Sequence, residues 1–596
     1  MSARFRGRPV LLGLLLTAAL VVLGALGTSA RRGTGASPTA ASLGPPKGDH
    51  KGLPLSEAAL FSGFARRNDV PGAEHARQLE EDEAKYEKNQ AEVGVAVRQA
   101  NADYNLRPQD ETSIAIRPGT SGASGTWVIG ANDYGIGVPI GGGAYTSSGV
   151  TYFPPFPLLV TTDGVVEPPV GTGDPAVAYG RARPGTPGIK PGTPVVYYGS
   201  LAFSAQNCEN GVQVARSLDD GHDWNRTFVP TVVPGGVGFV AYQGLASDCT
   251  VFHDKEYIAV DNSGGPHDGR VYVTWTKFLF DRLGNYLRSP IMMAWSDDNG
   301  TTFSTPVQVS GDSMTWCPNE SAPGNAGHCV ENQFSVPVVL ANGNVAVAFE
   351  NDQGAGFNQG YRDQYLMTVV GPNGVVVGGP YHVADLYDGI NDYPINQDGR
   401  QTLCNSNFRV NSAGNLAVDA AGNLYVTYSD DRSQAGQFPY PTYVGNRASG
   451  YACPAGKSTN TDVYLLASTD GGKSWKEITP EAAQAKNDQW FPWVAAGAKG
   501  RVDVVFYDRS KDSKNKLAWT TLAQSADGGK HWTATAASGF ASNFDDAFFG
   551  TGRFIGDYNG LAIDSRGYSH PVWTGVTPGK QDSDIFTSTV PAPGGD

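Results

Sequence analysis

One eight-residue phrase recurs along the chain and constrains its fold more than any other feature. The phrase is Ser-x-Asp-x-Gly-x-x-Trp/Phe, and its copies begin at Ser217, Ser296, Ser468 and Ser525. Ser and Asp side chains bond to the backbone of a tight turn, and Gly supplies a backbone angle that other residues resist. The aromatic residue then returns to the sheet and packs beneath the turn. The phrase therefore predicts a repeated β-hairpin, and it gives its Asp residues a structural role.

A longer unit, two apolar strands joined by a Gly-containing turn, repeats over the same part of the chain. Its spacing is typical of propellers and other repeat arrays. The last unit, Phe554–Val590, has no turn phrase and too few strands, so we expect a strand from the N-terminal side to complete it. An eroded copy of the phrase is expected near Gly371–Gly379. The units begin near Glu111, Asp174, Asp254, Glu331, Asn411, Asp488 and Phe554.

The turn phrases are Asp boxes, and with them the chain resembles the sialidase-like (BNR/Asp-box repeat) β-propeller superfamily over roughly residues 110–590. The resemblance implies an all-β fold, a β-propeller of four-stranded antiparallel blades. The unit count favours seven blades over six. Because this superfamily includes hydrolases, lyases, receptors and assembly factors, the motif predicts the fold and leaves the activity open.

The N-terminal part has a different composition. An Arg-rich start, the apolar run Val10–Leu26 and the small residues up to Ala30 predict a signal peptide over 1–30, or a membrane anchor if the segment is not cleaved. Either outcome predicts a secreted or cell-surface protein. Residues 31–56 are rich in Gly, Ser, Pro and Ala and predict a linker.

Two further domains complete the predicted organisation. The charged stretch 57–105 predicts a short helical extension on the outside of the molecule. Residues 106–596 form the predicted propeller. We expect the protein to be a monomer.

Charge and cysteine content limit the partners. A net charge of −14 argues against nucleic acid, whose phosphates attract basic surfaces. An even number of cysteines in an exported chain predicts disulfides. The sequence leaves their pairing open, and we favour the nearest neighbours Cys208–Cys249, Cys317–Cys329 and Cys404–Cys453. Acid-rich loops could hold calcium, but no EF-hand or C-x-x-C run is present, so we assign no metal site and no cofactor.

Propeller geometry places a binding site opposite the Asp boxes. In a four-stranded blade the third-to-fourth turn lies on one face, whereas the first-strand entries and the second-to-third loops lie on the other. Polar and aromatic residues gathered on this second face suit carbohydrate recognition or glycoside hydrolysis. They include Glu111, Asp133, Tyr134, Asp174, Asp254, Lys255, Glu256, Glu350, Asp430, Arg432, Asp488, Trp490, Arg509, Asp557 and Tyr558.

The resemblance to sialidases implies roles for some of these residues. Tyr558 is the candidate nucleophile, Glu350 its helper and Asp133 the acid/base, since sialidases use a tyrosine nucleophile. Three arginines would bind the carboxylate of the substrate as a clamp, and an aromatic residue and an acid would bind the substrate beside them. These binding residues are Arg362, Arg432, Arg509, Trp490 and Asp557.

The chain departs from sialidases at the first blade. Where they carry an Arg-Ile-Pro motif, this sequence has Glu111-Thr-Ser-Ile-Ala-Ile, and Arg117 follows in a turn. Two alternatives to an exo-α-sialidase therefore stay open. One is another glycoside hydrolase or lyase that uses the acidic ring, and the other is a propeller that binds a glycan or a protein without catalysis.

Overall fold

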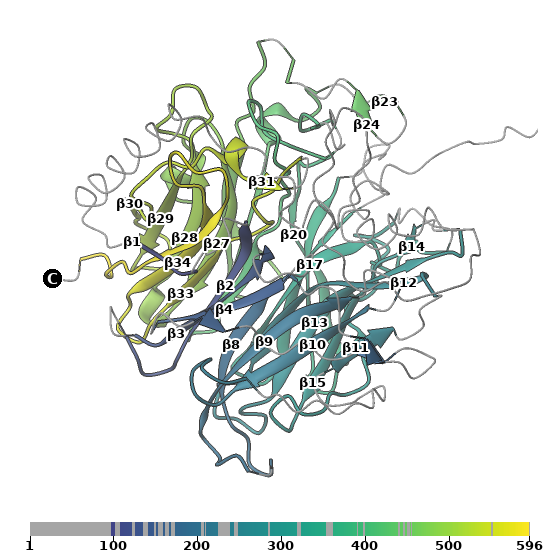
Figure 1. Cartoon of the computed structure of the whole chain (residues 1–596). Coiled ribbons are helices and arrows are strands. Elements are labelled where there is room, and N and C mark those ends of the chain that lie inside the picture. Colours follow the sequence, from purple (N-terminus) through teal and green to yellow (C-terminus); the bar gives the residue numbers. More distant parts are fainter. Residues whose placement is uncertain are drawn as a thin grey trace, which may run out of the picture.

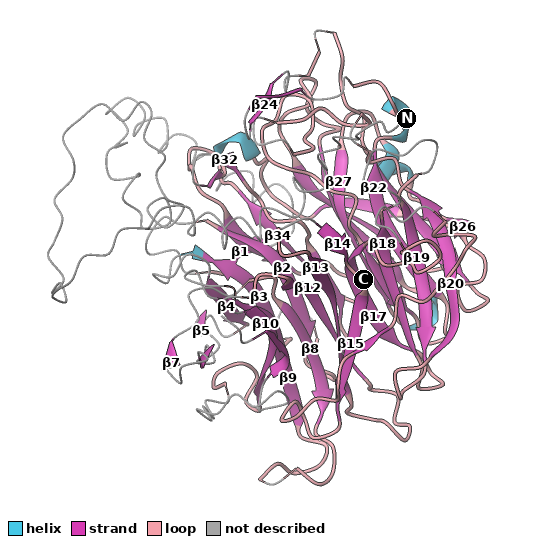
Figure 2. Ribbon diagram, turned by 90° about the vertical axis from the view of Figure 1, so that its right-hand side faces the viewer, coloured by secondary structure: helices cyan, strands magenta, loops and turns pink. Residues whose placement is uncertain are grey.

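The computed structural model describes the chain from Val97 to Gly594 with short gaps, the longest at 225–238. Strands and loops make up nearly all of this part (Figure 2). The predicted signal segment, the linker and most of the predicted helical extension lie outside the described residues. Short 3-10 turns occur at η5 (Arg432–Gln434), η6 (Glu481–Gln484), η7 (Ala498–Gly500) and η8 (Phe544–Asp546).

Seven antiparallel sheets form the blades, and in the first six the strands follow one another along the chain from the inner to the outer edge. The first blade is β2 (Gln109–Ile116), β3 (Trp127–Asp133), β4 (Gly141–Thr146) and β5 (Thr151–Tyr152). The second is β8 (Ala176–Arg181), β9 (Pro194–Phe203), β10 (Asn210–Ser217) and β11 (Phe239–Gln243). The third is β12 (Val251–Val260), β13 (Val271–Phe280), β15 (Ile291–Ser296) and β16 (Val307–Gln308), with β14 (Tyr286–Arg288) beside β13.

The remaining blades follow the same order. The fourth is β17 (Asn332–Val339), β18 (Val345–Asn351), β19 (Gln364–Val370) and β20 (Val376–Asp385). The fifth is β21 (Asn415–Val418), β22 (Leu424–Asp430), β25 (Asp462–Ser468) and β26 (Lys476–Glu477). The sixth is β27 (Gln489–Ala496), β28 (Val502–Asp508), β29 (Trp519–Ser525) and β30 (Thr533–Ala536). Small two-stranded ribbons lie outside the blades at β6 (Leu159–Val160) with β7 (Val166–Glu167), β23 (Thr442–Val444) with β24 (Arg447–Ser449), and β31 (Phe548–Phe549) with β32 (Gly552–Arg553).

The seventh blade closes the ring with a strand from the other end of the chain. Its strands are β33 (Gly560–Ile563), β34 (Ser569–Gly575), β35 (Asp584–Ser588) and, on the outside, β1 (Val97–Gln99). Asn101 reinforces this closure, because its side chain donates to both Gln109 and Asp584. The predicted completion from the N-terminal side is confirmed, and residues 97–99 are strand rather than the helix predicted there.

The first strands of the blades line the centre of the molecule. Contacts run from β2 to β8, β12, β17, β21, β27 and β33 and back to β2. Figure 1 shows the same arrangement, with the purple first strands and the yellow last strands of the described part side by side. Apolar layers between neighbouring blades form the core and bury Trp275, Trp490 and Trp573. The predicted seven-bladed β-propeller is therefore confirmed.

Each Asp box forms the turn between the third and fourth strands of its blade, as predicted. In the box at Ser468, the hydroxyl donates to Asp470 and accepts from the backbone N–H of Gly472. Asp470 in turn accepts from the backbone N–H and the hydroxyl of Ser474. The expected eroded copy also occupies a third-to-fourth turn, between β19 and β20.

The glycine of each box also meets the preceding blade. Gly472 has a φ of +87°, and a Cβ added there would overlap the side chain of Met367 on β19. Gly221, Gly300 and Gly529 face the blade before their own in the same way. The boxes therefore close hairpins and also lock neighbouring blades together.

The three disulfides join Cys208 to Cys249, Cys317 to Cys329 and Cys404 to Cys453. The predicted nearest-neighbour pairing is confirmed. Such bonds are typical of proteins that fold in an oxidising compartment. Among the described residues, no helix is long and apolar enough to cross a membrane.

Candidate functional site

A repeated irregularity in the first strands shapes the centre of the face opposite the Asp boxes. The pairing of β2, β12, β17 and β27 with their neighbours shifts at a β-bulge. At these bulges Glu111, Lys255, Phe334 and Phe491 have φ values near +50°, which non-glycine residues adopt rarely. Bulges redirect side chains and are frequent beside functional sites. Here they bring polar residues of different blades together.

Lys255 is the hub of this central cluster. Its ammonium nitrogen lies 3.3 Å from Glu111, 3.2 Å from Asp174 and 2.9 Å from Asp557. The three carboxylates come from the first, second and seventh blades, while Lys255 belongs to the third. The ammonium also lies 5.2 Å from the ring centre of Tyr558. One cation thus joins the inner edges of four blades.

Arg409 is the second cation of the central cluster. Its guanidinium grips Asp557 in a bidentate pair, with Nε 2.8 Å and Nη2 2.5 Å from the two carboxylate oxygens. Bidentate pairs of this kind are among the strongest charge-assisted hydrogen bonds. The Arg409 side chain is 22% exposed, whereas that of Asp557 is only 3% exposed. Arg409 therefore separates Asp557 from the solvent.

The carboxyl groups of the cluster fall into two protonation classes. Burial opposes ionisation of both Asp174 and Asp557, but Lys255 lowers the pKa of Asp174, and Arg409 lowers that of Asp557. In contrast, burial raises the pKa of Asp110 and that of Asp254 to about 8.

Two glutamates join the protonated class. Burial and the charge of Asp174 raise the pKa of Glu111 and that of Glu256 well above the usual range. At neutral pH the two ionised carboxylates therefore balance Lys255 and Arg409, and four carboxyl groups keep their protons. Environments that push the pKa values of neighbouring acids apart are what acid/base catalysis requires.

Asn132 on β3 joins the protonated acids to the ring of blades. Its side-chain amide donates to Glu111 at 2.8 Å and to Asp110 at 3.2 Å, and its oxygen accepts from the backbone N–H of Asp174 at 3.0 Å. Tyr134 also donates to Asp110, at 3.4 Å. Both oxygens of the buried Glu256 have no hydrogen-bond partner within the described part of the chain.

The structure places the predicted catalytic residues in different surroundings. Tyr558 lies in the central cluster and is 8% exposed. Burial and the charges of Glu111 and Asp174 raise the pKa of its phenol. Asp133 accepts from Tyr145 and Gln109 inside the first blade.

Glu350, the predicted helper of Tyr558, lies in a neighbouring acidic group at the end of β18. Burial and the charge of Asp388 raise its pKa, with smaller contributions from Asp352 and Asp363. Its Oε1 atom has no hydrogen-bond partner among the described residues. The carboxylates that act on Tyr558 are instead those of the central cluster.

Two of the three predicted clamp arginines lie together on the rim. The guanidinium of Arg362 stacks 3.9 Å from the ring centre of Tyr387, and that of Arg432 lies 5.5 Å from the same ring. Arg432 also stacks on Tyr464 at 3.5 Å. Their side chains are 38% and 32% exposed and pair with Asp392 and Asp430.

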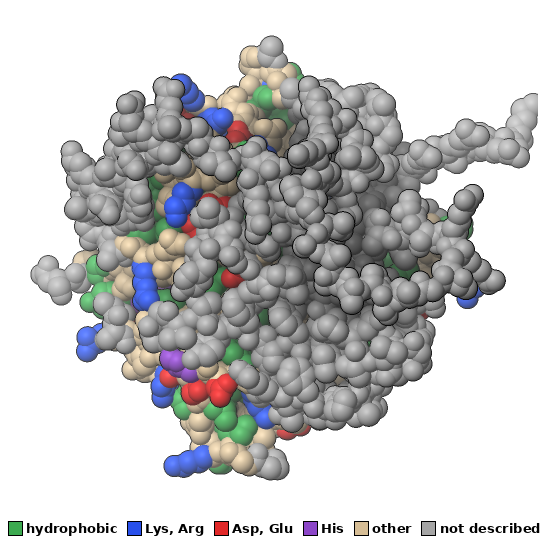
Figure 3. Space-filling model, viewed as in Figure 1, with side chains coloured by type: hydrophobic (Ala, Val, Ile, Leu, Met, Phe, Trp, Pro, Cys, Tyr) green, Lys and Arg blue, Asp and Glu red, His purple; other side chains and the backbone are tan. Residues whose placement is uncertain are grey.

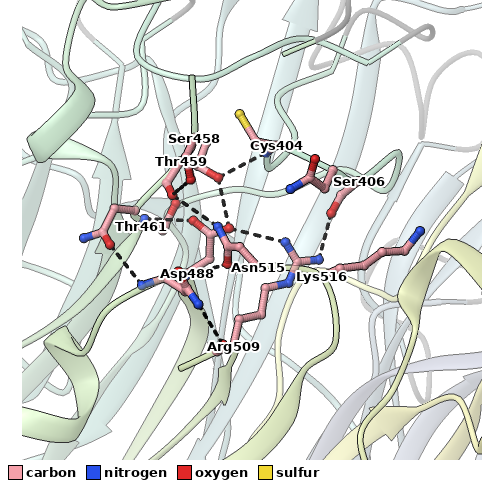
Figure 4. Close-up of polar contacts among 12 residues, drawn as sticks. Cys404, Ser406, Ser458, Thr459, Thr461, Asp488, Arg509, Asn515 and Lys516 are labelled. Atoms are coloured by element: carbon pink, nitrogen blue, oxygen red, sulfur yellow. Dashed lines mark hydrogen bonds and ion pairs between the residues drawn. The ribbon is translucent and has the colours of Figure 1, made fainter. Parts of the chain in front are cut away.

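Arg509 is instead buried between the fifth and sixth blades (Figure 4). Only 1% of its side chain is exposed, and it pairs with the fully buried Asp488 at 3.3 Å. Its guanidinium lies 4.9 Å from the ring centre of Trp490, which is also fully buried. The described contacts thus divide the predicted binding residues among the central cluster, the rim and this interior network.

The sequence did not indicate that two cations, Lys255 and Arg409, hold the carboxylates of the central cluster together. Lys255 was visible as a charged triplet, Asp254-Lys255-Glu256, inside an otherwise apolar strand. Arg409 gave no signal, because its partner Asp557 lies 148 residues away in the sequence. Among the described residues no group of His, Cys, Asp and Glu has the arrangement of a metal site. On the visible surface of the described part, acidic and basic side chains are interspersed (Figure 3).

No protein-family model matches the sequence, and no curated protein matches it. Several solved structures match the chain over most of their own length. The alpha-L-arabinanase of Penicillium chrysogenum complexed with arabinobiose has 13% identity and a TM-score of 0.35, over 67% of this chain and 90% of that chain. The Hadza microbial sialidase Hz136 has 12% identity and a TM-score of 0.37, over 76% and 73%. A PL25 ulvan lyase has 12% identity and a TM-score of 0.39, over 82% and 95%.

At such identities and TM-scores, the likeness to these structures concerns the fold alone. The prediction of a sialidase-like Asp-box propeller is confirmed at this level by the chain's own seven blades and by the position of its Asp boxes.

Proposed function

We propose that this protein is an exported propeller that acts on carbohydrate through the central cluster. The observation that supports this most is that the ionised Asp557 lies near protonated carboxyl groups, those of Asp110 and Glu111, at the inner ends of the blades. Hydrolysis of a glycosidic bond needs one carboxylic acid to protonate the leaving oxygen and one carboxylate to assist the attack. One oxygen each of Glu111, Asp174 and Asp557 lies beside the Lys255 ammonium nitrogen. Any two of these oxygens are therefore separated by no more than the sum of their two distances to that nitrogen.

In this proposal Asp557 is the ionised partner and Glu111 supplies the proton. Lys255 and Arg409 keep Asp557 charged, and the raised pKa of Glu111 keeps its proton available near neutral pH. Tyr134 and Asn132 hold the neighbouring acids in place. Asp174 and Arg409 are the partly exposed members and would meet a sugar first.

An exo-sialidase remains the narrower form of the proposal. Tyr558 would be its nucleophile, and Arg362 with Arg432 would bind the substrate carboxylate from the rim. The raised pKa of the Tyr558 phenol requires a neighbouring base for this chemistry, and the ionised Asp174, whose charge acts on this phenol, is the candidate. In this form Glu350 and Asp133 are the candidate helper and acid, and Trp490 and Arg509 are candidate binding residues.

A non-catalytic glycan-binding propeller is the second candidate function. It is favoured by the burial of the cluster, since the side chains of Glu111 and Asp557 are 2% and 3% exposed. Binding by the partly exposed Arg409 and Asp174 would then need no bond cleavage.

Product release from defined sugars tests the proposal. The wild type should release reducing ends from a polysaccharide panel of arabinan, β-glucan and polygalacturonate, or fluorophore from a sialoside. Asp557→Asn should abolish that release, and Tyr558→Phe should abolish it only if the sialidase form is right. If the wild type binds a glycan and releases nothing, binding without catalysis is the function. If it neither binds nor cleaves any of them, the proposal is wrong.

A further inference from the structure

The loop that carries Arg409 to the central cluster begins at Cys404. We call residues 404–409 the Arg409 loop. Its last residue reaches Asp557 in the cluster, whereas its first residues lie in the interior network of Arg509 (Figure 4). The loop therefore connects two parts of the molecule that share no direct contact among the described interactions.

The interior network fixes the start of the Arg409 loop. Arg509 donates from Nη2 to the hydroxyl of Ser406 at 2.7 Å. The backbone N–H of Cys404 donates to the Thr459 hydroxyl, and this hydroxyl donates to Asp488. The Cys404–Cys453 disulfide adds a covalent anchor at the same end.

The middle of the loop is fixed as well. Phe408 is fully buried and packs against Trp490 and Phe544, with ring centres 5.7 Å from each. The guanidinium of Arg509 lies 5.8 Å from the Phe408 ring, so Arg509 touches the loop at two places. The backbone N–H of Asn407 donates to Asp545 at 3.0 Å. Every residue from Ser406 to Phe408 is thus held before the chain reaches Arg409.

We infer that Arg509 is a positioning residue, which holds the Arg409 loop so that the Arg409 guanidinium meets Asp557 in the central cluster. This inference rests on the proposed function for its meaning, since it assigns Arg509 a role behind the site rather than in it. In this role Arg509 does not contact the ligand, and it acts on Arg409 through Ser406 and Phe408. A buried guanidinium suits this role because it offers several donors in a rigid plane.

Arg501 provides a matched control. Arg501 and Arg509 flank opposite ends of β28, both are buried, and each pairs with an Asp. Arg501 pairs with Asp503 at 2.8 Å and bonds to Ser569, away from the Arg409 loop. Replacing either arginine by methionine removes a buried charge from the same blade, so a purely structural effect should be similar for the two.

A double-mutant cycle without any ligand tests the inference. Urea unfolding is measured for Arg509→Met, Asp557→Asn and the double variant, and for the same cycle built on Arg501→Met. If Arg509 positions Arg409 against Asp557, the two substitutions are not independent. The unfolding equilibrium constant of the double variant should then be at least tenfold smaller than the value expected by multiplying the two single effects. Distant sites normally multiply to within about a factor of two, which is what the Arg501 cycle should show.

Ser406→Ala keeps the test available if Arg509→Met does not fold. It removes only the hydroxyl that accepts from Arg509, and its cycle with Asp557→Asn should show coupling in the same direction of at least threefold. The inference is wrong if the effects of Arg509→Met and Ser406→Ala are both independent of that of Asp557→Asn. It is also wrong if the Arg501 cycle shows equal coupling. Because no sugar is involved, failure of the proposed function would leave these results unchanged.

Discussion

The two faces of this propeller use the same residue type, aspartate, in opposite ways. In the Asp box at Ser468, Asp470 accepts from Ser468 and from Ser474, all within one turn, and these bonds lower its pKa to about 2. In the central cluster, Asp110 belongs to a strand and takes its partners from another strand and the loop after it, and burial raises its pKa to about 8.

The difference between the faces is one of local and non-local assembly. In this Asp box, the Asp470 carboxylate accepts its hydrogen bonds from Ser hydroxyls and a backbone N–H of its own turn, so these bonds need no partner from another blade. The central cluster exists only when several blades meet around Lys255 and Arg409. Burial raises the pKa of carboxyl groups such as Asp110 and Glu111 there, so they keep protons that acid/base chemistry can use.

Loss of the Lys255 ammonium should have the largest effect. Lys255→Met leaves the ionised Asp174 and Asp557 without their shared cation, and removing one partner of a buried ion pair costs about 3–5 kcal/mol. Urea unfolding should show this loss. Arg117→Met is the control on the Asp-box face, where the partly exposed pair with Asp220 contributes about 1 kcal/mol or less. Equal effects of the two substitutions would contradict the contrast between the faces.

A smaller effect should come from the glycine contact between blades. Gly471 and Gly472 both have positive φ, so alanine at either costs roughly 1–2 kcal/mol in backbone strain. At Gly472 the new methyl group would also meet Met367, whereas at Gly471 nothing lies within 4 Å. Gly472→Ala should therefore lower the free energy of unfolding by about 1–3 kcal/mol more than Gly471→Ala. If the two variants unfold alike, the Asp boxes do not lock the blades.

The pH dependence of stability should distinguish the protonated acids. The pKa of Asp110 is about 8 in the folded protein and about 4 in an unfolded chain. The folded state then binds the extra proton between these values, so this group's contribution to stability is complete below pH 4 and is lost as the pH rises through 8. Calorimetry should show a steeper fall of Tm over this range for the wild type than for Asp110→Asn. A steeper fall in the variant would contradict the assignment.

The parts of the molecule that the sequence predicts well are those built from neighbouring residues. The Asp boxes, their place in the third-to-fourth turns and the face opposite them all follow from short motifs. Cys317–Cys329 follows from proximity as well. Each of these needs only the chain within one or two blades.

The central cluster could be predicted only in part, because it depends on which strands meet. Asp557 and Tyr558 were found from their position at a blade entry, but Arg409 lies in a loop with no motif. Arg432 and Arg509 follow similar Asp-containing sequences, and each pairs with a buried Asp, yet only Arg509 is itself buried and bonds to Ser406 in the loop before β21. No local pattern distinguishes the half-buried Arg432 from the fully buried Arg509.

Glycan binding by three proteins tests the central claim most directly. The wild type, Asp557→Asn and Asp470→Asn are titrated with sialyllactose and with oligosaccharides of arabinan, β-glucan and polygalacturonate, below the Tm of each. We expect the wild type and Asp470→Asn to bind the same glycan equally, and Asp557→Asn to bind it at least tenfold more weakly. Loss of binding in Asp470→Asn with binding retained in Asp557→Asn would place the site on the Asp-box face and contradict the account.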